Sequence, residues 1–75
     1  MNIKYNSKEI KKGDIFIALK TNNDGHKYVN DAIKNGASKI IAEYGEYPVE
    51  TIKVDNTKEY LVNYLYDNYY NEIKD

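Results

Sequence analysis

The apolar residues of this chain form short runs in its first half and a periodic stripe in its last third. The clearest run is residues 15–19 (IFIAL), which follows the turn pair Gly13 and Asp14. It is too short for an isolated helix and rich in residues that favour strands. An unbroken apolar run predicts a strand that is covered on both faces. Residues 20–23 are polar and predict a loop at its end.

A short helix is predicted after this loop. Asp24 is a good N-cap, because its carboxylate can accept hydrogen bonds from the free amides of the first turn, and Gly36 is a stop signal. Between them the apolar residues fall on one side of a helix, at Tyr28, Val29, Ala32 and Ile33. Residues 37–43 (ASKIIAE) then predict a second inner strand, reached by a right-handed crossover.

Two further strands complete the predicted sheet. Ile3 and Tyr5 alternate with polar residues, which predicts a short edge strand with one buried face. Residues 49–54 predict a strand that extends the sheet, and Ile10 is the apolar anchor of the connection between the first two strands. Strands that alternate with helices predict an α/β fold. We therefore expect a small, mostly parallel sheet with helices packed on it, in a single domain over residues 1–75.

The end of the chain predicts a long helix with a broad apolar face. Residues 56–59 (NTKE) fit a capping box, with Asn56 bonding forward and Glu59 reaching back. Apolar and tyrosine residues then recur at spacings of three and four, at Tyr60, Leu61, Val62, Tyr64, Leu65, Tyr66, Asn68, Tyr69 and Tyr70. The stripe exceeds what one small sheet needs, but on so short a chain a broad stripe is more often core than interface, so we expect it mainly to pack on the sheet. The alternative is that part of it faces another domain or a partner chain.

Composition excludes several classes of function. The 75 residues include no cysteine, which removes disulfides, thiol catalysis and zinc-thiolate sites. The formal net charge is −1 and every basic residue is a lysine, so nucleic-acid binding through bidentate arginine is excluded. No run approaches the roughly 20 apolar residues that span a bilayer, and the N-terminus lacks the apolar core of a signal peptide. We expect no membrane partner and a cytoplasmic location.

The residues form no catalytic constellation. Ser7 lacks the setting of a nucleophile elbow, and no glycine loop of the form G-x-x-x-x-G-K-[ST] is available for ATP phosphates. His26 is the only histidine, so a histidine pair for a metal cannot be assembled within the chain. The sequence therefore predicts no catalytic residue and no metal site, and the chain alone is not expected to be a complete enzyme.

Small hydrogen-bonding residues leave two neighbouring strands of the predicted sheet. Ser7 follows the first strand, and Thr21, Asn22 and Asn23 follow the buried one. Such groups match the donors and acceptors of a uracil or a ribose, and the ends of parallel strands meet at one edge of a sheet. The same residues are also good turn formers. From the residues alone, a nucleoside site and a set of ordinary turns are both open interpretations.

Ordered segments along nearly the whole chain resemble one family pattern. They are NSK at 6–8, KGDIFIALK at 12–20, DGHKYV at 24–29, AI at 32–33, GA at 36–37, Glu43, and VDNTK at 54–58. The pattern reads D-S-R-x-V-x-P-G-D-L-F-V-A-L-x-G, D-G-H-x-F-I, A-I, G-A and a closing glutamate, with V-x-D-T-R opening the last helix. It belongs to the N-terminal domain of Mur ligases, most closely the MurE type, UDP-N-acetylmuramoyl-tripeptide synthetase.

This resemblance implies a substrate-holding domain. Mur ligases are ATP-dependent enzymes of cell-wall synthesis, and the MurE type adds diaminopimelate or lysine to UDP-N-acetylmuramoyl-L-Ala-D-Glu. Their N-terminal domain holds the uridine end of the UDP-N-acetylmuramoyl-peptide. The resemblance implies that ATP and Mg²⁺ act in a central ATP-binding domain and that this domain and the C-terminal domain lie outside these residues. The expected partners are that substrate and that central domain, with no cofactor in the chain itself.

The resemblance also assigns residues to the uridine site. Ser7 matches the serine whose hydroxyl meets the uridine, and Tyr5 stands where a leucine lines the same site. The loop that closes over the nucleotide is matched by Thr21, Asn22 and Asn23. Asp24 is then mainly the cap of the following helix. Two alternatives stay open: the equivalent MurF-type domain, and a stand-alone interaction module that has kept the fold and lost the nucleotide.

Overall fold

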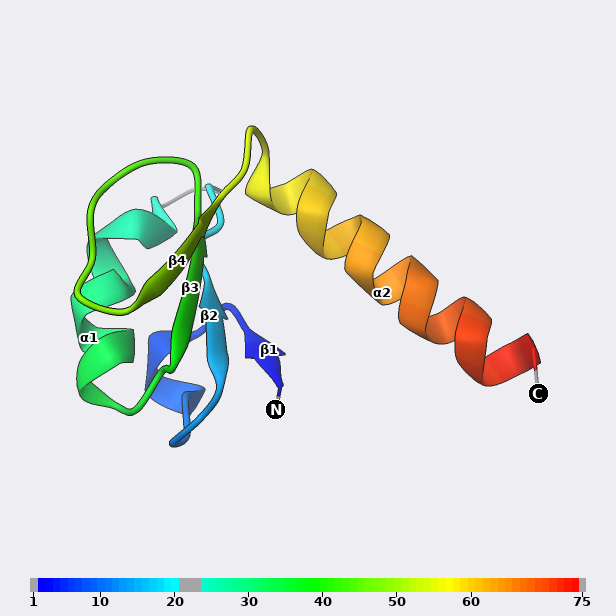
Figure 1. Cartoon of the computed structure of the whole chain (residues 1–75), viewed down its shortest axis with the longest axis horizontal. Helices are drawn as coiled ribbons and strands as arrows, with labels where there is room; N and C mark the ends of the chain where they lie inside the picture. Colours follow the sequence, from blue (N-terminus) through cyan, green and yellow to red (C-terminus); the bar gives the residue numbers. More distant parts are fainter. Residues whose placement is uncertain (1, 21–23, 75) are drawn as a thin grey trace.

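The computed structural model describes residues 2–20 and 24–74, which form a parallel sheet of four strands with helices on both sides (Figure 1). The strands are β1 (Ile3–Lys4), β2 (Ile15–Ile17), β3 (Lys39–Ala42) and β4 (Glu50–Lys53). Two short 3₁₀ helices and two α-helices accompany them: η1 (Ser7–Glu9), η2 (Gly25–Tyr28), α1 (Val29–Lys34) and α2 (Thr57–Lys74).

The strands lie side by side in chain order, and each neighbouring pair is parallel. The predicted α/β fold with a small parallel sheet is thereby confirmed. Phe16 of β2 is paired with Ile40 of β3, and Ile17 with Ile41. All four strands run in one direction, so the loops that follow them leave from one edge of the sheet, which is where parallel sheets usually hold ligands.

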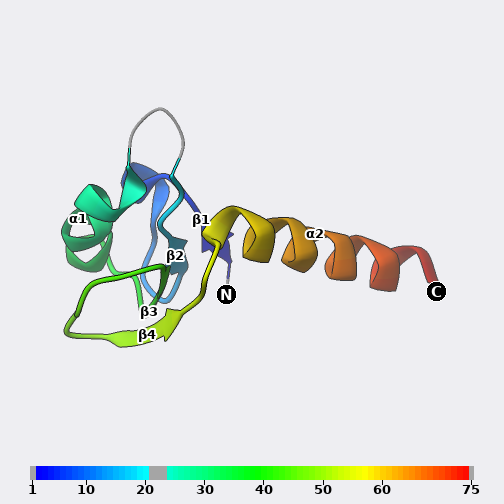
Figure 2. The ribbon, with the colours of Figure 1, turned by 90° about the horizontal axis from the view of Figure 1, so that it is seen from above.

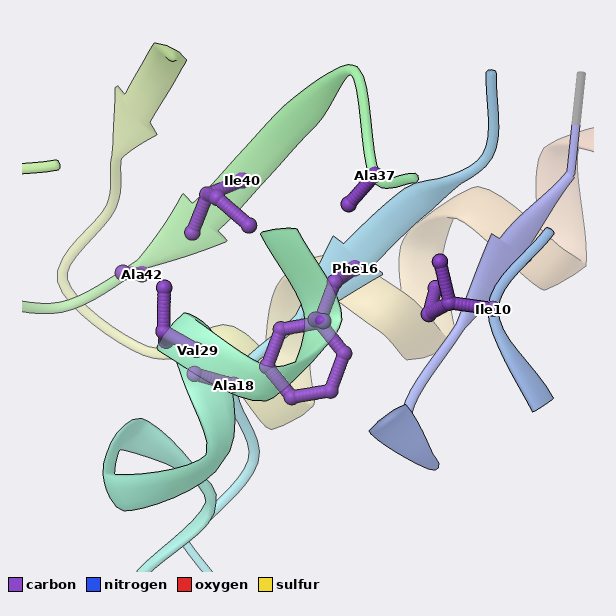
Figure 3. Packing of buried hydrophobic residues seen from close by; sticks show 8 residues of the cluster. Ile10, Phe16, Ala18, Val29, Ala37, Ile40 and Ala42 are labelled. Carbon is purple, nitrogen blue, oxygen red and sulfur yellow. The ribbon is translucent and has the colours of Figure 1, made fainter. Parts of the chain in front are cut away.

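The hydrophobic core lies between the sheet and α1. Figure 3 shows the Phe16 ring pointing from β2 toward α1. The buried residues of this cluster are Ile10, Phe16, Ala18, Val29, Ala32, Ala37, Ile40 and Ala42. Ile10 is buried as the predicted anchor of the first connection. Ile17 and Ile41, which alternate with the cluster along their strands, are also buried, so the prediction that β2 is covered on both faces is confirmed.

The prediction of a buried face on the first strand is wrong at Tyr5. The strand ends at Lys4, and the Tyr5 side chain is 68% exposed. Asn6 accepts the backbone N–H of Lys8 and starts η1, so the chain turns out of the sheet before Tyr5 can pack. Lys4, which the alternation places toward solvent, is instead half-buried, and its ammonium lies 2.8 Å from the carboxylate of Asp14.

Helix α2 starts at the sheet and then runs away from it, on the side opposite α1 (Figures 1 and 2). Val62, Leu65 and Tyr66 are 56–65% exposed, so the expectation that the stripe packs on the sheet is wrong for these residues. The reason is length. An 18-residue helix is about 27 Å long, whereas the longest strands have four residues and span about 13 Å. Among the described residues, no helix is long and apolar enough to cross a membrane.

Removing one methyl group from the core should lower the free energy of unfolding more than removing most of an exposed side chain on α2. Ile40→Val is expected to lower the free energy of unfolding by about 0.5–1.5 kcal/mol, because Ile40 is fully buried against α1. Leu65→Ala removes more atoms but from an exposed position, and should change it by less than about 0.5 kcal/mol. Urea denaturation followed by circular dichroism measures both. A larger cost for Leu65→Ala would show that α2 packs on the domain along its length.

Candidate binding site

A pocket of about 650 Å³ opens where the chain leaves β1 and β2. Tyr5 directly follows β1, and Leu19 follows the buried run of β2, so the pocket lies at the carboxyl ends of two neighbouring parallel strands. The lining residues are Tyr5, Asn6, Ser7, Lys8, Leu19, Tyr28 and Asp31. Exposed rings and an aliphatic side chain are thus combined with an amide, a hydroxyl and one charge of each sign.

One wall of the pocket is the turn η1. The Asn6 side chain accepts the Lys8 N–H at 3.0 Å, which caps the turn, and the Asn35 amide donates to the carbonyl of Ser7 at 2.8 Å. Asn35 lies at the carboxyl end of α1, so this bond joins η1 to that helix. Ser7 is buried and held by its backbone, while Tyr5 is exposed beside it.

The opposite wall is held by a close approach of two backbones. Gly25 donates its N–H to the carbonyl of Leu19 at 2.7 Å. A Cβ atom at Gly25 would lie 2.7 Å from that oxygen and 2.8 Å from the Leu19 nitrogen, which leaves no room for a side chain. Glycine is therefore required where η2 begins. The contact sets the position of η2, and Tyr28 at its far end lines the pocket together with Leu19.

The structure brings together two of the residues that the sequence assigns to the site. Tyr5 and Ser7 line the same pocket. Thr21, Asn22 and Asn23 lie outside the described residues, and their role stays a prediction. Asp24 is not part of the pocket lining. It occupies the N-cap of η2, where its carboxylate accepts the His26 N–H at 2.9 Å.

Sequence reasoning did not assign Tyr28 and Asp31 to the pocket that Ser7 lines. Tyr28 was assigned to the buried stripe of the helix, but its side chain is 39% exposed in the pocket. Asp31, three residues later, shares its face of the helix, as the spacing of three requires. A tyrosine at the margin of an apolar stripe with a carboxylate three residues on is the signal that would have identified both.

A polar network lies beside the pocket and is centred on His26. The imidazole is buried, with Nδ1 2.7 Å from a carboxylate oxygen of Asp24 and Nε2 2.9 Å from the backbone nitrogen of Glu43. Because Nε2 accepts the N–H of Glu43, the ring carries its proton on Nδ1 and donates it to Asp24. The contact with Asp24 completes the cap of η2, and the bond to Glu43 joins this cap to the end of β3.

Tyr44 and Thr57 extend this network in two directions. The Tyr44 ring stacks on His26 with centroids 4.0 Å apart, and its hydroxyl donates to the second carboxylate oxygen of Asp24. The carboxylate of Glu43 accepts both the backbone N–H of Thr57, at 3.0 Å, and its hydroxyl, at 3.1 Å. The network therefore connects the start of η2, the end of β3 and the first residue of α2.

These hydrogen bonds shift the acidity of their members. The Tyr44 hydroxyl, followed by the backbone N–H of His26, holds the pKa of Asp24 far below its ordinary value. The same bond raises the pKa of Tyr44 to about 12. The N–H of Thr57 lowers the pKa of Glu43. Each carboxylate is thus kept charged as an acceptor, and a network of this kind orders the backbone. Within the described part of the chain, no group of three or more His, Asp or Glu residues is arranged to hold a metal ion.

Fold and pocket define a small parallel α/β domain with a pocket at the carboxyl ends of its first two strands. No family model matches the chain. It is 40% identical over 73 residues to a UDP-N-acetylmuramoyl-L-alanyl-D-glutamate–2,6-diaminopimelate ligase of Clostridioides difficile, covering 93% of this chain and 15% of that protein. It is 56% identical over 39 residues to a UDP-N-acetylmuramoyl-tripeptide–D-alanyl-D-alanine ligase of Rickettsia prowazekii, covering 52% of this chain and 9% of the relative.

A solved structure shows the same fold. MurF ligase from Thermotoga maritima, in complex with ADP, superposes with a TM-score of 0.75 at 34% identity, over 83% of this chain and 15% of that one. The chain is a Mur ligase N-terminal-like domain, and its sequence is most like the MurE type. It spans about 15% of the length of the diaminopimelate ligases that it matches.

The bond between Tyr44 and Asp24 should make stability depend on alkaline pH. The raised pKa of Tyr44 means that its contribution is complete below the ordinary value of 10.0 and is lost as pH rises through about 12. Tyr44→Phe should therefore be less stable than the wild type at pH 8, and the difference should shrink between pH 10 and 12. Urea denaturation of both proteins at each pH measures it. Tyr5→Phe, at an exposed ring, is the control. A difference that is independent of pH would contradict the assignment.

Proposed function

We propose that this chain binds the uridine end of a UDP-N-acetylmuramoyl-peptide in the pocket beside η1. It would do so for an ATP-dependent ligase of peptidoglycan synthesis of the MurE type, which adds diaminopimelate or lysine to UDP-N-acetylmuramoyl-L-Ala-D-Glu. Such a ligase would act in the cytoplasm. The names of the Clostridioides difficile and Clostridium tetani relatives, both diaminopimelate ligases, support the proposal.

One observation carries the proposal. Ser7 and Tyr5, which match the family's uridine positions by sequence, line a single pocket at the carboxyl ends of two parallel strands. Its volume of about 650 Å³ falls in the range of small-ligand sites, about 300–1,000 Å³. The position is the one expected for a ligand in a parallel sheet.

The lining residues suit a nucleoside diphosphate. The Ser7 hydroxyl can both donate to and accept from the uracil or the ribose, and the Tyr28 ring supplies an apolar wall. Lys8 provides a positive charge for the diphosphate at the mouth. The Asp31 carboxylate is an acceptor for an N–H or a hydroxyl of the ligand and disfavours phosphate on its own side.

In this proposal residues 1–75 form the N-terminal substrate-holding domain of a parent enzyme. The ATP, the Mg²⁺ and the amino acid would be bound by central and C-terminal domains outside these residues. The ADP in the MurF structure from Thermotoga maritima supports the use of ATP by a related ligase. The partner of this domain within the enzyme would be the central ATP-binding domain.

A MurF-type parent is the second candidate. The MurF structures of Thermotoga maritima and Acinetobacter baumannii share the fold, at TM-scores of 0.75 and 0.72, and the Rickettsia prowazekii relative is named for the D-alanyl-D-alanine reaction. The names of both types carry a UDP-N-acetylmuramoyl group, so the pocket would hold the same end of either substrate. A stand-alone interaction module is the third candidate, and the exposed side chains of α2 are the observation that favours it.

Titration of the ¹⁵N-labelled chain with UDP, and then with UDP-N-acetylmuramoyl-dipeptide, tests the proposal. Amide shifts are expected at Ser7, Lys8, Leu19, Tyr28 and Asp31. Ser7→Ala should weaken binding about 2- to 10-fold, the usual worth of one hydrogen bond. Ser38→Ala is the matched control, because its hydroxyl bonds to the backbone of Gly13, away from the pocket lining.

ADP serves as the control ligand in the same titration. Equal shifts with UDP and ADP would show a general phosphate site and contradict the uridine assignment. No shift at the pocket with any of the three ligands would favour the interaction module.

A further inference from the structure

The short helix η2 belongs to both the pocket and the polar network. Its last residue, Tyr28, lines the pocket, while His26, two residues earlier, is buried in the network. Gly25 at its start is held against Leu19, which also lines the pocket. Both residues lie in one four-residue helix, so a displacement of that helix would move Tyr28 and His26 together.

Glu43 passes such a displacement on to α2. Its backbone N–H donates to Nε2 of His26, and its carboxylate accepts from the N–H and hydroxyl of Thr57. Thr57 is fully buried and is the first residue of α2. The first amides of a helix have no partner within it, so Glu43 caps α2 from fourteen positions earlier in the chain, and its negative charge lies at the favourable end of the helix dipole.

The first turn of α2 controls where the rest of the helix points. Figures 1 and 2 show α2 close to the sheet at its start and projecting from it thereafter. Asn56 accepts the Glu59 N–H at 2.9 Å, which supplies the forward half of the predicted capping box, and Glu43 supplies the bond to Thr57. The long-range cap links this turn to the residue that follows β3.

We propose that His26 is a positioning residue that couples occupancy of the pocket to the capping and direction of α2. The path runs from Tyr28 through His26 and Glu43 to Thr57. The response to ligand rests on the proposed nucleotide site, whereas the link from His26 to Thr57 does not depend on it. A hydrogen bond weakens steeply as it bends, so a small shift of η2 changes the bond that holds Glu43 in place.

Two substitutions at His26 separate this role from simple packing. In His26→Gln the side-chain oxygen reaches the position of Nε2 and can still accept the N–H of Glu43. In His26→Asn the side-chain nitrogen takes the position of Nδ1 and can still donate to Asp24, but nothing reaches Glu43. Both variants lose the ring that stacks on Tyr44, so their loss of packing is matched.

Amide hydrogen exchange of the ligand-free 75-residue chain tests the link between His26 and α2. The amides of Thr57 and Lys58 should exchange about 2- to 10-fold faster in His26→Asn than in the wild type, and nearly at the wild-type rate in His26→Gln. Glu43→Ala should behave like His26→Asn, and Glu43→Gln, which retains an acceptor, like the wild type. This second pair tests the step from Glu43 to Thr57 if the His26 variants do not fold, because equal exchange in the two Glu43 variants would remove the path to α2. Equal exchange within each pair would overturn the proposal.

Titration with UDP tests the coupling to the pocket. In the wild type the amides of Thr57 and Lys58 should shift together with that of Tyr28. In His26→Asn the Tyr28 amide should still shift and the Thr57 amide should not, whereas His26→Gln should retain both. Shifts at Tyr28 without shifts at Thr57 in the wild type would overturn the coupling and leave the proposed function standing. Absence of every shift would contradict the proposed function and the coupling to ligand, while the exchange measurement would still decide the link from His26 to Thr57.

Discussion

The buried pairing of β2 with β3 is the constraint on which the rest of the structure depends. Phe16 and Ile40 close one face of this pair against α1, and Ile17 and Ile41 are buried on the other. Because the two strands are parallel and covered on both faces, neither can slip without exposing a fully buried row. The chain leaves the carboxyl end of β2 at the pocket, which Leu19 lines. It leaves the carboxyl end of β3 at the polar network, which includes Glu43.

The short helix η2 contributes residues to both the pocket and the polar network. Tight backbone contact between Gly25 and Leu19 places η2, and the two ends of η2 then face different surroundings. At one end Tyr28 is exposed and lines the pocket. At the other end His26 is buried, and its hydrogen bonds to Asp24 and Glu43 orient the ring. A domain of this size has a small hydrophobic core. The satisfied hydrogen bonds of the polar network therefore help to fix η2, β3 and α2 relative to one another.

The order and direction of the strands could be predicted from local sequence patterns, whereas the exposure of the apolar face of α2 could not. Continuous apolar runs and a glycine stop are short-range signals, so the inner strands and α1 were predicted from residues 15–19 and 24–43. The stripe of α2 is equally clear as a helix, but whether Leu65 is covered depends on how far the sheet extends, and four short strands reach only its first turns. The prediction that Tyr5 is buried was also wrong, because the cap at Asn6 starts η1 and the strand ends before Tyr5.

The class of fold, the family and two residues of the pocket, Ser7 and Tyr5, could be predicted from the order of residues along the chain. These rest on periodicity, turn residues and ordered motifs, all of which are local. Tertiary packing was needed to bring Tyr28 and Asp31 into the same pocket as Ser7, and to let His26 accept a hydrogen bond from Glu43, whose carboxylate caps α2 at Thr57. Those contacts join residues 14 to 24 positions apart through the packing of α1 and β3 on β2, which no local pattern encodes.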